Sequence, residues 1–493
     1  MRYFLLLLLP ALLLASCLKD DAYTASPNDR LAFSKDTVAF DTIISGEPTK
    51  TYSFMVYNHA DKALRIPNVA LQKGQDSPFR VNVDGSALVG GCGTDFEIAR
   101  KDSMVVYLMA NVPENDTDQP VKYEDKLVFT TEAGTSQEVV LTASGQDVIT
   151  LKEHHIQADE TWSARRPYRI MDSLVVDRGA TLTLEAGTCL MFHSKAQLIV
   201  HGRLIINGSA TEPVTLRGDR LDDMFTNQPY DRTPGLWGGI VLKEESYDNH
   251  INYADIHSST DGLRVDSSDL SRCTLTLENS IIHNTTHHGL NLRMANVYVG
   301  NSQLTNTGGD CVHVRGGDIQ MVHCTLGRFY LFTGGSGGAA IDFANYDGDV
   351  RLPLQRMDIT NSIITGYQSD EMMGNFNKRF EEDAFNYHFD HCLINTDPIT
   401  NDEHFTNCLW DDGKSTTTIT EAVSRDKNFT PDFNTSTLEF SFALSPKSKA
   451  VGTADATATA ATYPLDRLGT PRTTAPDMGC YQHQAEASAQ QQP

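Results

Sequence analysis

The sequence predicts an all-β protein in two parts, a β-sandwich followed by a coil of stacked parallel strands. Residues 30–147 alternate apolar and polar side chains with the period of a strand. Residues 148–483 carry short apolar runs that end in turns, and a repeat of 22 residues separates Asn279 from Asn301. Because 493 residues exceed one compact core, and neither part has a helical period, we expect two β-units of different construction.

The first 16 residues have the composition of a secretory leader. Arg2 precedes an apolar run of about a dozen residues, which suits an export signal and is short for a spanning helix. The run ends in Leu-Ala-Ser before Cys17, which resembles the bacterial lipobox, where the leader is cleaved and the cysteine is acylated. The resemblance implies a signal peptide over 1–16, lipidation of Cys17 and a tether over 17–29. The alternative is an ordinary signal peptide with an incidental cysteine.

The residues after Cys17 predict the cellular location of the protein. Lys19-Asp20-Asp21 resembles the export signal of Bacteroidetes lipoproteins, which are routed to the outer face of the outer membrane. That resemblance implies an outer-membrane protein that is lipid-anchored and faces the cell exterior. No later stretch approaches about 20 apolar residues, so the acyl groups are the expected attachment to the membrane.

The segment 30–147 carries the signals of a sandwich. Short β-rich runs, among them 105–108 and 126–129, alternate with turn-forming clusters at regular spacing. Phe40-Asp41-Thr42, followed later by Pro78-Phe79 and a closing Leu-Thr-Ala-Ser-Gly, resembles the immunoglobulin-like domains of the HYDIN/ASPM type. Such a resemblance implies a spacer or a module that binds a partner.

The segment 148–483 carries the signals of a solenoid. The motif at Asn279 recurs at Asn301 and His323, and looser copies follow. Short strands that each end at a glycine turn resemble the rungs of the right-handed parallel β-helix (pectin lyase-like) proteins. The C-terminal Leu-Ser-Pro…Pro-Asp-Met-Gly resembles the Leu-Ser-Pro…Pro-Asp-Ile-Gly that closes the last coil in many such surface proteins. The tail 484–493 is expected to be disordered.

Setting three repeats in register on Asn252, Asn279 and Asn301 predicts which side chains face outward. Leu263, Leu290 and Val312 fall at one equivalent position, and each is followed two residues later by another apolar residue, so both sets should point inward. Neighbours in an outward column then lie about 4.8 Å apart. The outward columns are Arg264, Asn291 and His313; Asp266, Arg293 and Arg315; and Asp261, His288 and Asp310.

These columns form the predicted functional face. Carboxylates, imidazoles and guanidiniums side by side are the groups that bind sugars and perform acid–base chemistry on acidic glycans. The alternative is a solvated face whose charges simply alternate. The catalytic candidates are His288, Arg293, Asp310, His313 and Arg315, and the candidates for glycan binding are Asp261, Arg264, Asp266 and Asn291.

One tripeptide on this face suggests a reaction. Gly309-Asp310-Cys311 resembles the Gly-Asp-Asp-Cys motif of polygalacturonases, with Gly309 in place of that family's first aspartate. The other motifs of that family are not found, which counts against hydrolysis by its mechanism.

No cofactor is predicted, and a transition-metal site is not expected because His-x-x-His and Cys-x-x-Cys spacings are missing. A calcium site is the one metal candidate, formed by Asp342, Asp347 and Asp349, and its alternative is a polar surface loop. The cysteines at the serine position of the repeat, such as Cys324, predict a stack of small residues inside the coil.

The formal net charge of −24, from 40 basic and 64 acidic residues, argues against a nucleic-acid partner. The leading functional prediction is a surface lipoprotein whose β-helix binds extracellular polysaccharide or a surface protein of a host or neighbouring cell. The alternatives are a polysaccharide lyase or glycoside hydrolase that acts on acidic glycans, and a non-catalytic structural component of the cell surface.

Overall fold

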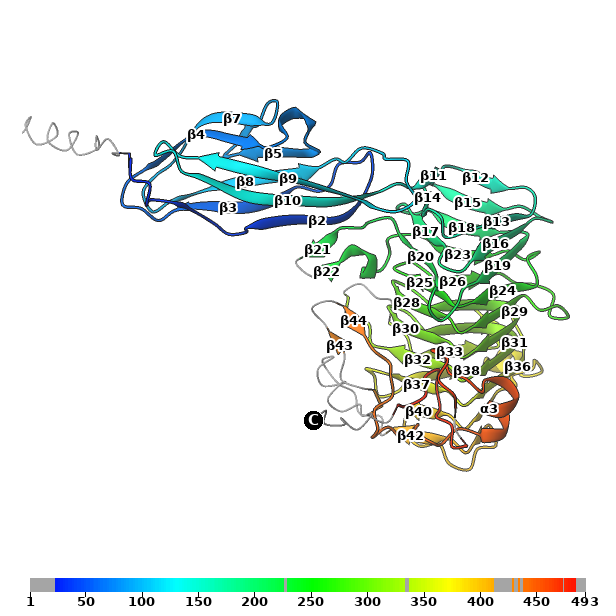
Figure 1. Cartoon of the computed structure of the whole chain (residues 1–493). Helices are drawn as coiled ribbons and strands as arrows, with labels where there is room; N and C mark the ends of the chain where they lie inside the picture. Colours follow the sequence, from blue (N-terminus) through cyan, green and yellow to red (C-terminus); the bar gives the residue numbers. More distant parts are fainter. Residues whose placement is uncertain are drawn as a thin grey trace, which may run out of the picture. The chain divides into compact units, whose positions relative to one another are not determined.

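The computed structural model describes residues 23–225, 228–332, 337–411, 428–429, 433–434, 438–472 and 474–484 (Figure 1). The leader, Cys17 and nearly all of the expected tail lie outside these residues. The chain divides into two compact units, Met1–Asp147 and Val148–Pro493. Within the described ranges, no helix combines the length and apolar character that crossing a membrane requires.

The first unit is a sandwich of two five-stranded sheets, with strand orders β1-β3-β8-β5-β6 and β2-β10-β9-β4-β7. Neighbouring strands are antiparallel except for β2 and β10, which are parallel. The strands are β1 (Leu31–Phe33), β2 (Thr37–Ile44), β3 (Tyr52–Asn58), β4 (Leu64–Leu71), β5 (Phe79–Val83), β6 (Ser86–Ala87), β7 (Cys92–Ile98), β8 (Ser103–Ala110), β9 (Val121–Thr130) and β10 (Ser136–Gln146), with a 3-10 turn η2 (Gly74–Asp76).

The strand period of the sequence explains this unit. Phe54 and Val56 in β3 are buried while Met55 between them is not, and Val106 and Leu108 in β8 repeat the pattern. The two inner faces share one core, in which Phe129 packs against the aromatic rings of the opposite sheet.

The second unit is a parallel β-helix with three stacks of strands (Figure 1). The first stack runs β12 (His154–Ile156), β15 (Ser173–Val176), β18 (Gln197–Val200), β23 (Gly239–Leu242), β26 (Leu263–Val265), the first parts of β29 (Leu290–Gly300) and β31 (Val312–Val322), β33 (Ile341–Ala344) and β38 (Met372–Asn375). The second runs β13 (Glu160–Trp162), β16 (Thr181–Glu185), β19 (Arg203–Asn207), β24 (Asn249–Asn252), β27 (Leu275–Glu278), the later parts of β29 and β31, β36 (Leu354–Thr360), β39 (His388–Asp390) and β41 (Phe405–Thr406).

The third stack is a separate 11-stranded sheet. It runs β11 (Ile149–Leu151), β14 (Tyr168–Ile170), β17 (Cys189–Phe192), β20 (Val214–Gly218), β25 (Ala254–His257), β28 (Ile281–Thr285), β30 (Gln303–Thr307), β32 (Thr325–Arg328), β37 (Ile363–Gly366), β40 (Leu393–Asn395) and β42 (Leu409–Asp411). The remaining elements are β21 (Asp223–Phe225), β22 (Gln228–Pro229), η3 (Tyr230–Arg232), β34 (Tyr346–Asp347), β35 (Val350–Arg351), η4 (Lys378–Phe380), β43 (Phe433–Asn434), β44 (Glu439–Phe440) and α3 (Ala456–Thr462).

The fold class is confirmed: the chain is a β-sandwich followed by a parallel β-helix. The predicted register is also confirmed, because Leu263 pairs with Leu290 and Leu290 with Val312. All three side chains are fully buried, as are their apolar partners two residues on. Inward apolar columns of this kind make one continuous core along the coil.

The asparagine of the repeat marks a corner of the coil. Asn279 and Asn301 both have φ of 50°, and His323 has 53°. Asparagine, aspartate and histidine tolerate this left-handed conformation better than other side chains, which explains why they recur there. The Asn301 side-chain amide also donates to the Asn279 oxygen at 2.7 Å, so the corners form a ladder.

One equivalence predicted from the sequence is wrong by one residue. Asn252 pairs with Glu278 rather than Asn279, and Tyr253 takes the left-handed corner with φ of 52°. The connection from Tyr253 to Leu263 is one residue shorter than the connection from Asn279 to Leu290, so Leu263 again pairs with Leu290.

The residue after each corner lies inside the coil. Ser280, Ser302 and Cys324 are fully buried, and the Ser302 hydroxyl accepts the Ser280 backbone N–H at 3.1 Å. The predicted internal stack of small residues is therefore confirmed.

The C-terminal segment returns over the outside of the third stack instead of only closing the last coil. The Tyr481 hydroxyl donates to Gln303 in β30 at 2.7 Å, and the Cys480 N–H donates to Thr325 in β32 at 3.1 Å. Phe442 packs against Phe329 in a separate apolar cluster. This segment therefore covers strands that lie far earlier in the sequence.

Candidate functional site

The predicted functional face lies on the first stack. Arg264, Asn291 and His313 are register partners on β26, β29 and β31, and Asp342 on β33 continues the column. Arg293 pairs with Arg315 in the next column. Residues from four successive rungs thus meet on one ribbon because parallel pairing aligns equivalent positions. We call these columns, with Asp310 and His288 at their edge, the ribbon face.

Asp310 is the most enclosed carboxylate of the ribbon face, with 5% of its side chain exposed. Its Oδ2 lies 2.7 Å from His313 Nδ1, and its Oδ1 accepts the backbone N–H of Ala339 at 2.8 Å. Burial alone would raise the pKa of Asp310, but the imidazoles of His288 and His313 and the Ala339 N–H outweigh it and hold that pKa well below the usual value. Asp310 is therefore a fixed anion between two imidazoles.

The two imidazoles have different roles around this anion. Their rings stack with centroids 4.2 Å apart. His288 Nδ1 lies 3.1 Å from the Asp310 backbone nitrogen and 3.2 Å from its Oδ2, so it accepts from the backbone when neutral and can donate to the carboxylate when protonated. His313 directs Nδ1 at Asp310, which leaves Nε2 without a partner among the described residues. A carboxylate that fixes one imidazole nitrogen presents the other as an acid or a base.

Arg315 extends the network to the next rung. Its Nη2 donates to Asp342 Oδ2 at 2.8 Å, and Asn375 Nδ2 donates to Asp342 Oδ1 at 2.9 Å. His313 Nδ1 lies 3.7 Å from the same Asp342 oxygen. The ribbon face therefore joins Asp310, His313, Asp342 and Arg315 in one chain of contacts.

The other predicted residues also lie on or beside the ribbon face. The Asp261 carboxylate accepts the His288 backbone N–H at 3.1 Å, which places the predicted column of Asp261, His288 and Asp310 together. Arg264 Nε lies 3.3 Å from Asp266, which also contacts Lys243. Arg293 Nη1 lies 3.4 Å from Asp347. Each arginine of the face is thus paired with a carboxylate.

The three carboxylates of the calcium candidate have separate cationic partners. Asp342 contacts Arg315, Asp347 contacts Arg293, and Asp349 lies 3.3 Å from Arg379. Among the described residues, these three carboxylates are not one of the clusters whose ligand atoms all lie within 4.8 Å of one another.

Sequence reasoning found this face where the rungs are regular and missed the rest. The Ala339 N–H reaches it from within the irregular stretch between His323 and Asn361, and Asn375 reaches it from beyond that stretch. The signal that could have found them is the apolar run at Ile341, whose register with Val312 aligns Asp342 with His313.

Comparison with known proteins gives fold likenesses only. No protein-family model and no curated protein matches the chain. Among solved structures, the catalytic unit of the thermostable GH87 α-1,3-glucanase from Streptomyces thermodiastaticus strain HF3-3 matches 74% of this chain and 89% of its own, with 11% identity and a TM-score of 0.28.

Two further structures each match about a quarter of the chain. A protein of unknown function from Porphyromonas gingivalis W83 matches 26% of this chain and 60% of its own, with 16% identity and a TM-score of 0.18. The PapD-like domain 7 of human CEP192 matches 25% of this chain and 90% of its own, with 12% identity and a TM-score of 0.18. At these TM-scores the likenesses carry no functional information.

Proposed function

We propose that the protein is a surface lipoprotein whose ribbon face binds extracellular glycan. The observation that carries the proposal is the preorganisation of this face: Asp310, His313, Asp342 and Arg315 hold one another in place through contacts of 2.7–3.7 Å. Side chains fixed before binding lose little conformational entropy when a ligand arrives.

The chemistry of the face suits sugar hydroxyls. A hydroxyl both donates and accepts, so it can bridge a carboxylate and a guanidinium that already face one another. Because each arginine is paired and the whole chain carries a charge of −24, a neutral or mixed glycan fits this face better than a polyanion.

The binding proposal is tested on an array of neutral glucans and uronic-acid polymers, followed by titration of the best binder. Arg293→Ala should weaken binding about 10-fold or more, because a hydrogen bond to a charged group contributes about 1.5–3 kcal/mol. Arg315→Lys, which keeps the charge but loses the fork geometry, should weaken it as well.

The matched control is Arg356→Ala on the second stack. Arg356 pairs with Asp318 at 2.7 Å and is 42% exposed, close to the 34% of Arg293, which pairs with Asp347. This variant should bind as the wild type does. Equal losses in both variants would contradict the proposed face, and silence on every glycan would favour a structural role at the cell surface.

The lipid anchor is part of the proposal and rests on the sequence around Cys17. Cells fed radiolabelled palmitate should incorporate label into the wild type and not into Cys17→Ser. Protease added to intact cells should degrade the wild type. An unlabelled wild type would overturn the anchor, and a protease-resistant one would overturn its outward orientation.

A second candidate function is acid–base chemistry on a glycan. The observation in its favour is the contact between Asp310 Oδ2 and His313 Nδ1, which leaves His313 Nε2 able to accept or donate a proton. Incubation with the same polymers should then release reducing ends or an unsaturated product that absorbs ultraviolet light. His313→Gln should abolish that turnover, and no turnover with any polymer would contradict this reading.

A further inference from the structure

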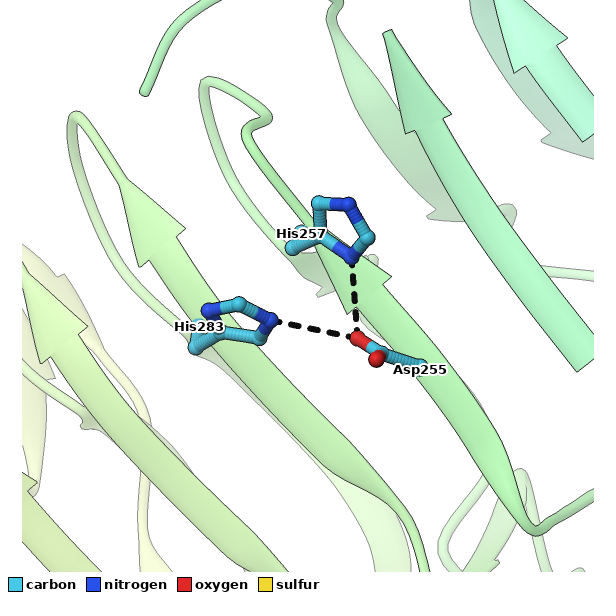
Figure 2. A group of neighbouring side chains, drawn as sticks. All are labelled: Asp255, His257 and His283. Carbon is cyan, nitrogen blue, oxygen red and sulfur yellow. Dashed lines mark hydrogen bonds and ion pairs between the residues drawn. The ribbon is translucent and has the colours of Figure 1, made fainter. Parts of the chain in front are cut away.

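A second cluster of ionisable side chains lies on the third stack, on a different sheet from the ribbon face. Asp255 and His257 are two residues apart on β25 and so project from the same side of the strand (Figure 2). His283 on β28 is the register partner of His257. Parallel pairing of adjacent rungs therefore brings one carboxylate and two imidazoles together.

The ligand atoms of this cluster converge on one point. Asp255 Oδ1 lies 2.9 Å from His257 Nδ1 and 3.2 Å from His283 Nε2, and all three atoms lie within 4.8 Å of one another (Figure 2). Ligand atoms around a tetrahedral zinc ion, with bonds near 2.0–2.2 Å, are roughly 3.3 Å apart. The observed separations need only small side-chain adjustments to reach that geometry.

Among the described residues, the converging atoms contact only one another. Asp255 Oδ1 contacts only the two imidazole nitrogens among the described residues. In the His288–Asp310–His313 cluster, by contrast, His288 Nδ1 accepts a backbone N–H. In the third comparable cluster, Asp390, His391 and Asp455, Asp390 Oδ1 also accepts from Asn407, and Asp455 caps helix α3. Of these three clusters, only the Asp255 cluster has ligand atoms whose described contacts are all within the cluster, so a shared ion would displace only those contacts.

The charge of the cluster also suits a cation. Partial burial would raise the pKa of Asp255, but the imidazoles of His257 and His283 outweigh it and hold that pKa well below the usual value. Asp255 therefore supplies the anionic ligand of the cluster, and a metal binds the two imidazoles in their neutral form.

A cavity of about 500 Å³ lies between the third stack and the returning C-terminal segment. His283 is the member of the cluster that lines this cavity, together with Gln303, Thr305 and Tyr481. The Asp255 side chain is 30% exposed. A metal held by three protein ligands would keep at least one open position for water or a ligand from this side.

We propose that Asp255, His257 and His283 bind one divalent first-row transition-metal ion, with Zn²⁺ as the representative ion. Two imidazole nitrogens with one carboxylate oxygen form a ligand set that such ions accept, whereas calcium and magnesium prefer oxygen. Sequence patterns do not indicate this site, because its ligands form no local motif and meet only through the pairing of β25 with β28.

The test is Zn²⁺ titration into the chelator-treated full-length protein, purified without a histidine tag. Calorimetry should give one equivalent bound for the wild type, and Co²⁺ should give the visible absorption of a low-symmetry site. His283→Gln should lower the affinity by more than the roughly 100-fold that losing an outer-shell contact costs. Asp255→Asn should do the same, and circular dichroism checks that each variant is folded.

The matched control is His288→Gln, which removes an imidazole from the cluster on the ribbon face. It should keep one equivalent of Zn²⁺ with the wild-type affinity. Failure of the wild type to bind Zn²⁺ or Co²⁺ would overturn the proposal, as would wild-type affinity in His283→Gln. Neither result bears on glycan binding, which involves the first stack.

Discussion

Asp310→Ala should lower the free energy of unfolding of the β-helix by about 3 kcal/mol. The substitution removes the acceptor of His313 Nδ1 and of the Ala339 N–H, and both donors are largely enclosed. Asp310→Asn should cost less than half as much, because it keeps an oxygen for Ala339.

Tryptophan fluorescence during urea unfolding reports this stability difference for the β-helix. All three tryptophans of the chain, Trp162, Trp237 and Trp410, lie in the β-helix. Glycan affinity should fall in parallel, since His313 loses its orienting partner. Equal stability of Asp310→Ala and the wild type would contradict the network described for the ribbon face.

The stabilising contribution of Asp310 should depend on pH and should be lost in acid. The folded-state pKa of Asp310 is depressed, so its stabilising contribution is complete above the unfolded value of about 3.9 and is lost as pH falls toward the folded value. The stability difference between the wild type and Asp310→Asn should therefore shrink below about pH 4. A difference that stays constant down to pH 2 would contradict the depressed pKa.

Other carboxylates do not obscure this comparison. Burial alone would raise the pKa of Glu245, but hydrogen bonds from His201 and Arg178 lower it to about 2. Glu245 therefore also loses its stabilising contribution in acid. Because it is present in both proteins, its effect cancels in the difference.

Trp237→Ala should have the largest effect of any single substitution in the coil interior, about 3–5 kcal/mol. Trp237 is 1% exposed, stacks on Phe192 with centroids 4.2 Å apart, and donates its indole N–H to the His257 carbonyl at 2.8 Å. Alanine leaves a cavity between rungs and an unsatisfied carbonyl.

Trp237→Phe separates these two contributions. It keeps the aromatic stack but loses the hydrogen bond, so we expect a cost of about 1–2 kcal/mol from the lost bond and the smaller ring. Unfolding followed by circular dichroism measures both variants without relying on the replaced fluorophore. A cost below 1 kcal/mol for Trp237→Ala would show that the core does not pack as described.

The coil could be predicted because its physical constraints are local and periodic. The left-handed corner favours asparagine or histidine, as at Asn279, Asn301 and His323, and the enclosed position after it favours a small side chain. With both positions set by the 22-residue spacing, the register of Asn291 with His313 follows.

The rest of the candidate sites could not be predicted because they depend on pairing across irregular connections. Asn375 reaches the ribbon face after insertions that break the repeat. Asp255 and His283 lie one rung apart, but nothing in their spacing of 28 residues distinguishes them from other polar pairs. The C-terminal segment lies far from Gln303 in the sequence, so no local spacing indicates the contact that Tyr481 makes with it.

The central claim, that the ribbon face binds glycan, is tested most directly by methionine oxidation footprinting. Met373 on β38 is the register partner of Asp342 and is 45% exposed, so it reports on the face itself. Met224 on β21 is 42% exposed and lies outside the ribbon face, which makes it an internal control. At a saturating concentration of the best-binding polymer from the array, oxidation of Met373 should slow at least several-fold while oxidation of Met224 stays unchanged. Unchanged oxidation of Met373 in the glycan-bound protein would contradict the account.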